Sequence, residues 1–404
     1  MDSVFDNLRE SNEFLNNLLD NIDAAVLVAD EKLRVHQFNR TFENLFESSP
    51  VDDAAPAAFG NMAGCQFCVE DNTNCGQSSH CRDCAIRQAL LRTLLERVPV
   101  EREYLSRVFY TNGVPTEKHL QFSTRPISHR GQSMIMVIIH DVTDLENSKR
   151  HLVEKQELLD QDLVAAAAIQ RSLLPDRSLD HDRVRMAWEF EPSGRIGGDI
   201  FNLHHMTEDF IAVYMADVCG HGVSAAMISV AVSQFLQTLR ARFVHAPENF
   251  RPSVVLDRLE RAFPFEKFDS FHTMVYAALD LKDGLLRYGV AGHPPPLLVR
   301  ADGGLDVLDV RGPVVGAGQG EHVQGEERLA PGDRLVLYTD GVTDAMSPEG
   351  AMFGMEGLET ELLRTRNLDN DAMLAAVHEA VRKYVGKGSR DDDISLLSLE
   401  YLGG

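Results

Sequence analysis

The sequence predicts two α+β domains joined by a long helix, and three observations point to this fold class. Apolar, strand-like runs alternate with helical patterns on both sides of residues 143–174. Residues 143–174 are polar, contain neither Gly nor Pro, and carry an apolar residue at every seventh position. The length of 404 residues suits two or three domains of ordinary size. We therefore expect an N-terminal domain over 1–144, a linker helix over 145–175 and a C-terminal domain over 176–404.

The composition is that of an ordinary globular protein with an excess of acid. Hydrophobic residues make up 44% and charged residues 25%, which excludes a disordered or low-complexity chain. The 62 acidic against 39 basic residues give a net charge of −23, which argues against nucleic acid and anionic membranes as partners. Because no signal peptide opens the sequence and no run of about 18 apolar residues occurs, we expect a cytoplasmic protein.

The N-terminal domain begins with a helix and continues with five strands. Apolar residues at helical spacing predict a helix over residues 3–20. Residues 24–30 predict a buried strand, residues 33–39 its hairpin partner, and Asn39 the start of a short helix. Three further strands are predicted over residues 98–110, 117–123 and 133–140. This order, with the ending Asp141-Val142-Thr143, resembles a PAS sensor domain over residues 12–144.

The linker helix has a seven-residue repeat in which one of the two positions that form a coiled-coil seam is always apolar. The companion seam position is apolar only at Ile169. We interpret the segment as a signalling helix that pairs as a coiled coil in a homodimer; the alternative is a long helix on the surface of its own domain. Pro175 is expected to end it. The seam residues are Leu145, Leu152, Leu159, Ala166 and Leu173, and the polar companions are Ser148, Lys155 and Asp162.

The sequence of the C-terminal domain predicts several strands, which are separated by Gly-rich turns and interleaved with helices. This texture is typical of an α+β domain. The strands are expected over residues 210–218, 273–281, 285–291, 334–339 and 394–401, and the helices over 223–241, 253–262, 355–366 and 370–385.

Aspartates stand at the ends of these strands, beside glycines or other acids. Asp199 follows two glycines, Asp217 ends a buried strand, Asp340 precedes Gly341, and residues 391–393 form an acidic triplet before the last strand. Taken singly, each acid could be only a turn or cap residue. Carboxylates brought together repel one another unless cations pair with them, and hard oxygen ligands suit Mg²⁺ or Mn²⁺. The pattern therefore predicts a pair of divalent metals that activates water.

Five motifs in this order resemble the metal-dependent protein phosphatase (PPM) family, in its RsbU/SpoIIE-like branch. They are GGD at 197–199, ADVCGHG at 216–222, AGHPPPLL at 291–298, YTDGVTDA at 338–345 and DDDIS at 391–395. AAAIQRSLLP at 166–175 is similar to the regulatory helix that enters the domain in that branch. The resemblance implies a four-layer α-β-β-α sandwich.

The resemblance also implies the roles of the site residues. Asp199, Asp217 and Asp340 match metal-binding aspartates, the Val218 carbonyl matches a backbone ligand, and Asp392 matches the last ligand with Asp393 as its neighbour. A water or hydroxide bridging two Mn²⁺ or Mg²⁺ ions then attacks the phosphorus of phosphoserine or phosphothreonine. The implied partner is a phosphorylated STAS-domain anti-sigma factor antagonist. The regulatory residues are expected to be Ile169, Gln170, Leu173 and Leu174.

Four residues near the motifs leave alternatives open. Asn202 stands where the family often has a second acid, and it offers an oxygen without charge. Cys219 stands in a usual serine position, as a small packing residue or as an oxidation-sensitive thiol. His221 is either a general acid or a turn residue with a structural hydrogen bond. Arg195 either reaches a substrate phosphate or is an ordinary surface arginine.

Five of the six cysteines crowd into positions 65–84, with His80 beside the fourth. The two C-x2-C pairs have spacing that suits zinc or an iron–sulfur cluster. Redox-switched thiols and buried cysteines without a ligand are the alternatives. The cluster consists of Cys65, Cys68, Cys75, Cys81 and Cys84.

Three functions compete at this point. The first is a signal-regulated serine/threonine phosphatase controlled by its PAS domain. The second is a binding or scaffold protein in which Asn202 has weakened catalysis. The third assigns the PAS domain to dimerisation alone, without a ligand. All four ligand aspartates are present, which favours the enzyme.

Overall fold

The structure is a computed structural model that describes residues 17–47, 57–129, 132–176, 181–243, 250–318, 320–386, 388 and 392–403. The chain divides into two compact units, Met1–Glu157 and Leu158–Gly404. The division falls within the long helix, inside the segment 145–175 that was expected to link the two domains. The described helices include none that is both long and apolar enough to cross a membrane.

A five-stranded antiparallel sheet forms the centre of the N-terminal unit. Its strand order is β2-β1-β5-β4-β3, so the hairpin β1–β2 lies beside the last strand. Every strand predicted in this domain is present, although the one expected over 117–123 is much longer. The strands are β1 (Ala25–Ala29), β2 (Val35–Phe38), β3 (Val100–Thr111), β4 (Val114–His129) and β5 (Gln132–Asp141).

Short helices pack against this sheet and complete its core. The predicted helix start at Asn39 is confirmed, because the Asn39 side chain accepts a hydrogen bond from the Phe42 N–H and caps α2. The helix expected over 3–20 lies mostly outside the described residues. Only its last four positions, 17–20, are described, and they are helical. The helices are α2 (Arg40–Phe46), α3 (Phe59–Met62), α4 (Gln66–Glu70), the 3₁₀ turn η1 (Ser79–Cys81) and α5 (Ala85–Glu96).

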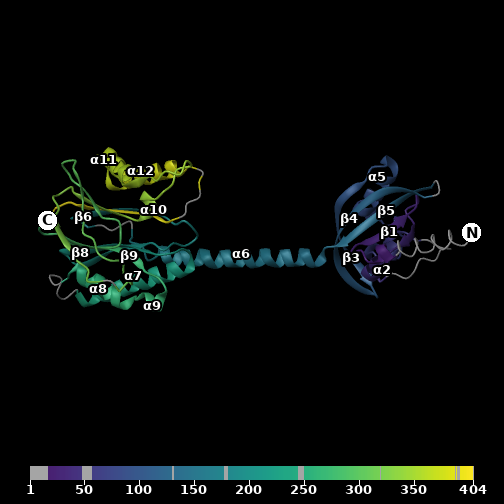
Figure 1. Cartoon of the computed structure of the whole chain (residues 1–404), viewed down its shortest axis with the longest axis horizontal. Helices are drawn as coiled ribbons and strands as arrows, with labels where there is room; N and C mark the ends of the chain where they lie inside the picture. The colour runs from purple at the N-terminus through teal and green to yellow at the C-terminus, as the bar shows by residue number, and fades with distance from the viewer. Residues whose placement is uncertain are drawn as a thin grey trace, which may run out of the picture. The chain divides into compact units, whose positions relative to one another are not determined.

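The predicted linker is one continuous helix, α6 (Thr143–Arg171; Figure 1). It ends four residues before Pro175, because the N–H groups of Leu173 and Leu174 bond three residues back and tighten the chain into a turn. The residue before a proline also disfavours helical geometry. Leu145, Leu152 and Leu159 are 65%, 67% and 57% exposed, whereas Leu173 packs against the C-terminal core.

The C-terminal unit contains two five-stranded sheets. The first has the order β13-β10-β9-β8-β7 and the second β12-β11-β14-β15-β6. The first consists of β7 (Ile200–Thr207), β8 (Phe210–Val218), β9 (His272–Asp280), β10 (Leu285–Ala291) and β13 (Gly325–Arg328). The second consists of β6 (Val184–Glu191), β11 (Leu297–Val299), β12 (Leu305–Val307), β14 (Arg334–Tyr338) and β15 (Ile394–Tyr401).

The two sheets pack face to face, and helices cover their outer faces (Figure 1). Helices α7 and α8 contact the first sheet, and α11 and α12 pack on the second. Strands β8 and β15 are buried almost throughout, so a carboxylate at either end marks the edge of the core. The helices are α7 (Val223–Phe243), α8 (Pro252–Ala262), α9 (Phe265–Phe268), α10 (Asp340–Thr343), α11 (Gly354–Thr365) and α12 (Asn370–Val385).

Candidate metal centre

Aspartates from both sheets of the C-terminal unit meet at one edge. Asp199 precedes β7 and Asp217 lies near the end of β8, both in the first sheet. Asp340 begins α10 directly after β14, and Asp393 precedes β15, both in the second sheet. The Asp199 N–H donates to Asp393 Oδ2 at 3.3 Å, which joins the two sheets at the site.

Asp199 is the most enclosed of these acids, at 1% exposure. Its Oδ2 accepts hydrogen bonds from Thr339 Oγ1 at 2.9 Å and from Ser395 Oγ at 2.5 Å. Its Oδ1 has no partner within the described part of the chain. Burial, followed by the charges of Asp217 and Asp393, raises the pKa of Asp199 well above its ordinary value.

Asp217 and Asp340 show the same shortage of positive charge. Burial, with the nearby Asp340, Asp392 and Asp393, raises the pKa of Asp217 to about 7. Burial and then Asp392 raise the pKa of Asp340, whose buried Oδ1 also lacks a partner among the described residues. Across the described ranges, neither these two acids nor Asp199 forms an ion pair with Lys or Arg. A bound cation would offset the negative charge that these carboxylates bring together.

The acidic triplet divides into two roles. Asp393 is buried, and its carboxylate accepts from the Ser193 N–H at 2.7 Å and the Ser193 hydroxyl at 3.0 Å, in addition to the Asp199 N–H. Its oxygens are thus occupied by the protein. Asp392 is exposed, and its Oδ1 accepts a hydrogen bond from the Asp393 N–H. The assignment of Asp392 as the metal ligand, with Asp393 as its neighbour, stays a prediction; residue 391 lies outside the described residues.

Glycines allow the backbone to approach these acids closely. A Cβ at Gly197 would overlap the Asp393 carboxylate, and one at Gly341 would overlap the Asp393 carbonyl. A Cβ at Gly198 would lie 2.6 Å from the Val218 carbonyl oxygen. The GGD and DG motifs therefore serve the packing around the acids, and they leave the Val218 carbonyl beside the same loop.

The donor set fits a divalent metal with oxygen ligands. Unpartnered buried carboxylate oxygens and mutually raised pKa values are what hard cations relieve. In the described part of the chain, no three His, Cys, Asp or Glu side chains have already converged on one metal position. The acids nevertheless lie close enough to raise one another's pKa values.

Comparisons with known proteins bear on the same region. Residues 207–402 match the family model described as Stage II sporulation protein E (SpoIIE). The chain is similar to this family over that span, which we call the SpoIIE-type domain for this resemblance. Asp217, Asp340 and Asp392 lie within the matched span, and Asp199 lies eight residues before it.

The relatives that match this region share about a quarter of its residues. The chain is 25% identical to protein IcfG of Synechocystis sp. over 254 residues, which cover 57% of this chain and 40% of that protein. It is 26% identical to phosphoserine phosphatase RsbP of Bacillus subtilis over 190 residues, which cover 46% of this chain and 45% of that protein. The SiaA-PP2C domain of Pseudomonas aeruginosa shares the fold, with a TM-score of 0.52, 24% identity, and coverage of 61% and 98%. The chain spans about half the length of the curated relatives it matches.

Two residues singled out from the sequence lie differently from their expected positions. Asn202 is not turned toward the acids: its Nδ2 donates to the Leu173 carbonyl at 2.6 Å, and its Oδ1 accepts from the Leu203 N–H. Its place three residues after Asp199 puts it on the opposite face of the extended chain. Cys219 is exposed, so the interpretation as a packing residue was wrong.

Two further side chains are accounted for on the surface of the SpoIIE-type domain. His221 stands between two glycines of positive φ with its ring exposed, and none of the described hydrogen bonds involves that ring. The expected structural hydrogen bond is therefore not seen. Arg195 pairs with Asp160 of α6 at 2.8 Å, so its guanidinium is already engaged with the helix.

The end of α6 is tied directly to the GGD loop by Gln170. This side chain is 3% exposed. Its Nε2 donates to the Gly197 carbonyl at 2.7 Å and to Ser229 Oγ of α7 at 3.2 Å, while its Oε1 accepts from the Gly197 N–H. Leu174 is buried beside it and Leu173 partly so, whereas Ile169 is 63% exposed. Of the four expected regulatory residues, three are thus packed and one faces solvent.

The acid cluster predicts how metal removal affects stability. The folded-state pKa of Asp217 is raised, so its contribution to stability is complete below its unfolded pKa, near 4, and is lost as pH rises through about 7. In EDTA, Asp217→Asn should therefore raise the melting temperature relative to wild type much more at pH 8 than at pH 5. The free-energy difference is on the order of a few kcal/mol.

The matched measurement is thermal unfolding of both proteins at both pH values, because titrating groups that do not interact with Asp217 cancel in the difference. Added Mn²⁺ at pH 8 should stabilise wild type and not the variant. An equal effect of the substitution at pH 5 and pH 8 would contradict the raised pKa.

The five clustered cysteines are brought together in the N-terminal unit. Cys65, Cys68, Cys75, Cys81 and Cys84 all line one cavity, and all are free thiols. His80 does not line it; its ring stacks on Phe67 with centroids 4.0 Å apart. Burial, and then the neighbouring cysteines, raises the pKa of Cys68 to about 12.

Proposed function

We propose that the chain is a metal-dependent protein serine/threonine phosphatase of the RsbU/SpoIIE type, with its catalytic domain folded as a four-layer α-β-β-α sandwich. The observation that carries the proposal is the gathering of Asp199, Asp217, Asp340 and Asp392 at one edge. One buried carboxylate oxygen of Asp199 and one of Asp340 have no partner among the described residues. The name of RsbP, a phosphoserine phosphatase, supports the class of substrate.

Two Mn²⁺ or Mg²⁺ ions would be held by Asp199, Asp217, Asp340, Asp392 and the Val218 carbonyl. When bound, they supply water activation and neutralise charge on the phosphoryl group. Thr339 and Ser395 fix the Asp199 carboxylate in one orientation through their hydroxyl groups. Asp393 anchors the Ser193 and Asp199 backbone, so the acids keep their spacing during turnover.

The substrate we propose is a serine- or threonine-phosphorylated STAS-domain antagonist of an anti-sigma factor. Dephosphorylation would let the antagonist bind the anti-sigma kinase and release a sigma factor. The acidic net charge of −23 disfavours nucleic acid and leaves a protein partner as the natural target.

A direct test is release of phosphate from a phosphoserine-bearing STAS-domain protein and from p-nitrophenyl phosphate, with Mn²⁺ and with EDTA. The proposal expects turnover of both substrates with Mn²⁺ and none with EDTA. The scaffold alternative expects tight binding of the STAS protein without metal-dependent turnover of either substrate. Turnover of p-nitrophenyl phosphate alone would retain the enzyme and reject the proposed partner.

The N-terminal unit is proposed to be a PAS-type sensor that signals through α6. The antiparallel sheet of order β2-β1-β5-β4-β3 supports this proposal, as do the short helices that all lie between β2 and β3 in the sequence. Gln170 offers the route, because a movement of α6 would pull on Gly197, two residues before Asp199. If the PAS unit only dimerises, replacing Gln170 is expected to leave turnover unchanged.

Dimerisation is proposed along the exposed leucines of α6. Leu152 and Leu159 are more than half exposed one heptad apart, which is costly in an isolated helix and suits a coiled-coil seam. The double variant Leu152→Glu/Leu159→Glu should shift the protein from dimer to monomer in light scattering after gel filtration. Glu154→Gln/Glu157→Gln on the same helix is the matched control and should stay dimeric. A wild-type monomer at micromolar concentration would reject the seam.

A further inference from the structure

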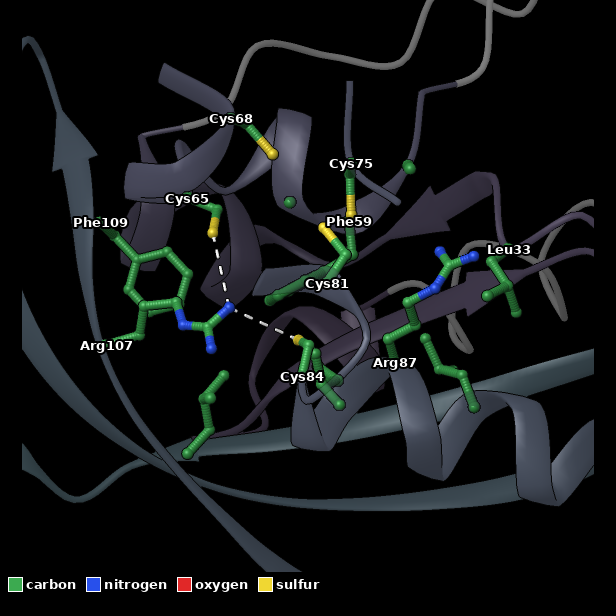
Figure 2. Close-up of a pocket in the computed structure, with 15 residues that line it drawn as sticks. Leu33, Phe59, Cys65, Cys68, Cys75, Cys81, Cys84, Arg87, Arg107 and Phe109 are labelled. Atoms are coloured by element: carbon green, nitrogen blue, oxygen red, sulfur yellow. Dashed lines mark hydrogen bonds between the residues drawn. The ribbon is translucent and has the colours of Figure 1, made fainter. Parts of the chain in front are cut away.

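Figure 2 shows the five clustered cysteines around one cavity of the N-terminal unit. They come from successive short elements: Cys65 and Cys68 from the start of α4, Cys81 from η1, and Cys84 from the residue before α5. Cys75 lies between the two pairs. Four of the five are buried, and none of the five forms a disulfide. Five cysteines from a stretch of twenty residues thus share one enclosed space.

The surroundings of the cavity are adapted to sulfur. A Cβ at Gly60 would lie 2.8 Å from Cys75 Sγ and 3.3 Å from Cys68 Sγ, so only glycine leaves room for these two atoms. The Gly76 N–H donates to Cys81 Sγ at 3.1 Å. Arg107 Nη1 lies 3.8 Å from Cys65 Sγ and 3.6 Å from Cys84 Sγ. Donors aimed at sulfur stabilise thiolates and tune metal–thiolate centres.

The size of the cavity limits its occupant. Its volume is about 30 Å³. Pockets for organic ligands and cofactors measure about 300–1,000 Å³, so a flavin, haem or similar molecule does not fit. Arg87 and Arg107 also line the cavity and bring positive charge to it. An inorganic group bound directly by the thiolates needs the least added space, because the cysteine sulfurs that already line the cavity form its outer shell. Its net negative charge would face the two arginines.

A single zinc ion fits the sulfur positions poorly. Four thiolates around zinc each lie about 2.3 Å from one point, which brings the sulfurs into mutual contact. Arg107 Nη1 lies between the sulfurs of Cys65 and Cys84, at 3.8 and 3.6 Å, so these two sulfurs are not in mutual contact (Figure 2). A cluster holds its thiolates farther apart than a single zinc ion does, and it would take the place of the Arg107 guanidinium between them.

We propose that the cavity binds an iron–sulfur cluster, ligated by the thiolates of Cys65, Cys68, Cys81 and Cys84. These four form the two C-x2-C pairs, in which a short turn holds both sulfurs on one side. Cys75 is the spare thiol beside the cluster. The N-terminal unit then responds to oxidants or to cellular redox state through the cluster. This inference stands independently of the phosphatase assignment.

The test uses the full chain purified without oxygen and, separately, the metal-free chain incubated with Fe²⁺ and sulfide. Iron, acid-labile sulfide and zinc are quantified, and visible absorption is followed before and after dithionite. The proposal expects iron and sulfide in equal, multiple amounts per chain and a broad absorption that dithionite bleaches. Zinc without iron, or no metal in either preparation, would overturn it.

Serine variants identify the ligands. Cys68→Ser and Cys81→Ser should lose more than about nine-tenths of the iron, because a cluster needs all four thiolates. Cys75→Ser and the exposed Cys219→Ser are the matched controls and should keep it. Circular dichroism and the thermal unfolding transition show whether each variant is folded. Equal iron loss in Cys75→Ser and Cys81→Ser would overturn the assignment of the four ligands.

Discussion

Replacing Asp217 by asparagine is expected to lower Mn²⁺-dependent phosphate release by at least about a thousandfold, because it removes a charge that the metals need. The substitution keeps the shape of the side chain. It also relieves repulsion from Asp340, Asp392 and Asp393, so the metal-free variant should fold and melt no earlier than wild type. The loss of turnover is then chemical rather than structural.

The measurement is kcat/KM for p-nitrophenyl phosphate across a titration of Mn²⁺, with circular dichroism as the check on folding. Glu356→Gln is the matched control, since Glu356 is an exposed acid in the first turn of α11. It should retain full activity. An Asp217→Asn variant that works within tenfold of wild type would remove Asp217 from the metal centre.

Replacing Gln170 by leucine should lower kcat about 10- to 100-fold, as small misplacements of catalytic groups do. Leucine has a similar volume but leaves the buried Gly197 N–H and C=O without their side-chain partner, at about 1–3 kcal/mol for each group. The loop that carries Asp199 would then shift or loosen. Reduced affinity for Mn²⁺ should accompany the lower kcat.

The matched control is Ile169→Ala, one residue earlier on the same helix and 63% exposed. It should leave kcat, Mn²⁺ affinity and melting temperature unchanged. A Gln170→Leu variant that loses stability but keeps kcat and Mn²⁺ affinity would make Gln170 a packing residue. In that case α6 is a passive linker.

Hydrophobic patterning predicted the long elements closely. The bounds of β8, β10, β15 and α12 are those expected from the sequence, because each is a continuous apolar run or a clear amphipathic pattern between turn residues. The sequence did not predict β7, which contains Asn202, His204 and His205 in an otherwise apolar run. Its strand character comes from pairing with β8, a tertiary interaction without a local signal.

The sequence predicted the aspartates of the site but not the residues that form hydrogen bonds with them. The aspartates could be located because each follows a local strand-end pattern. Ser193, Thr339 and Ser395 could not, since a hydroxyl near a strand end has no distinctive spacing and its acidic partner lies far along the chain. The orientation of Asn202 could not be predicted either, because the alternation that separates it from Asp199 applies only once β7 is known to be a strand.

The place of β15 in the second sheet has a consequence for biosynthesis. This strand lies between β14 and β6, and the residue before it reaches back to Ser193 and Asp199. Until the ribosome has released Ile394–Tyr401, β14 has an open edge and β6 lacks its partner. Open strand edges recruit other chains. A nascent chain stalled before Ile394 should therefore depend on chaperones, and the carboxylates can gather only after translation of the last strand.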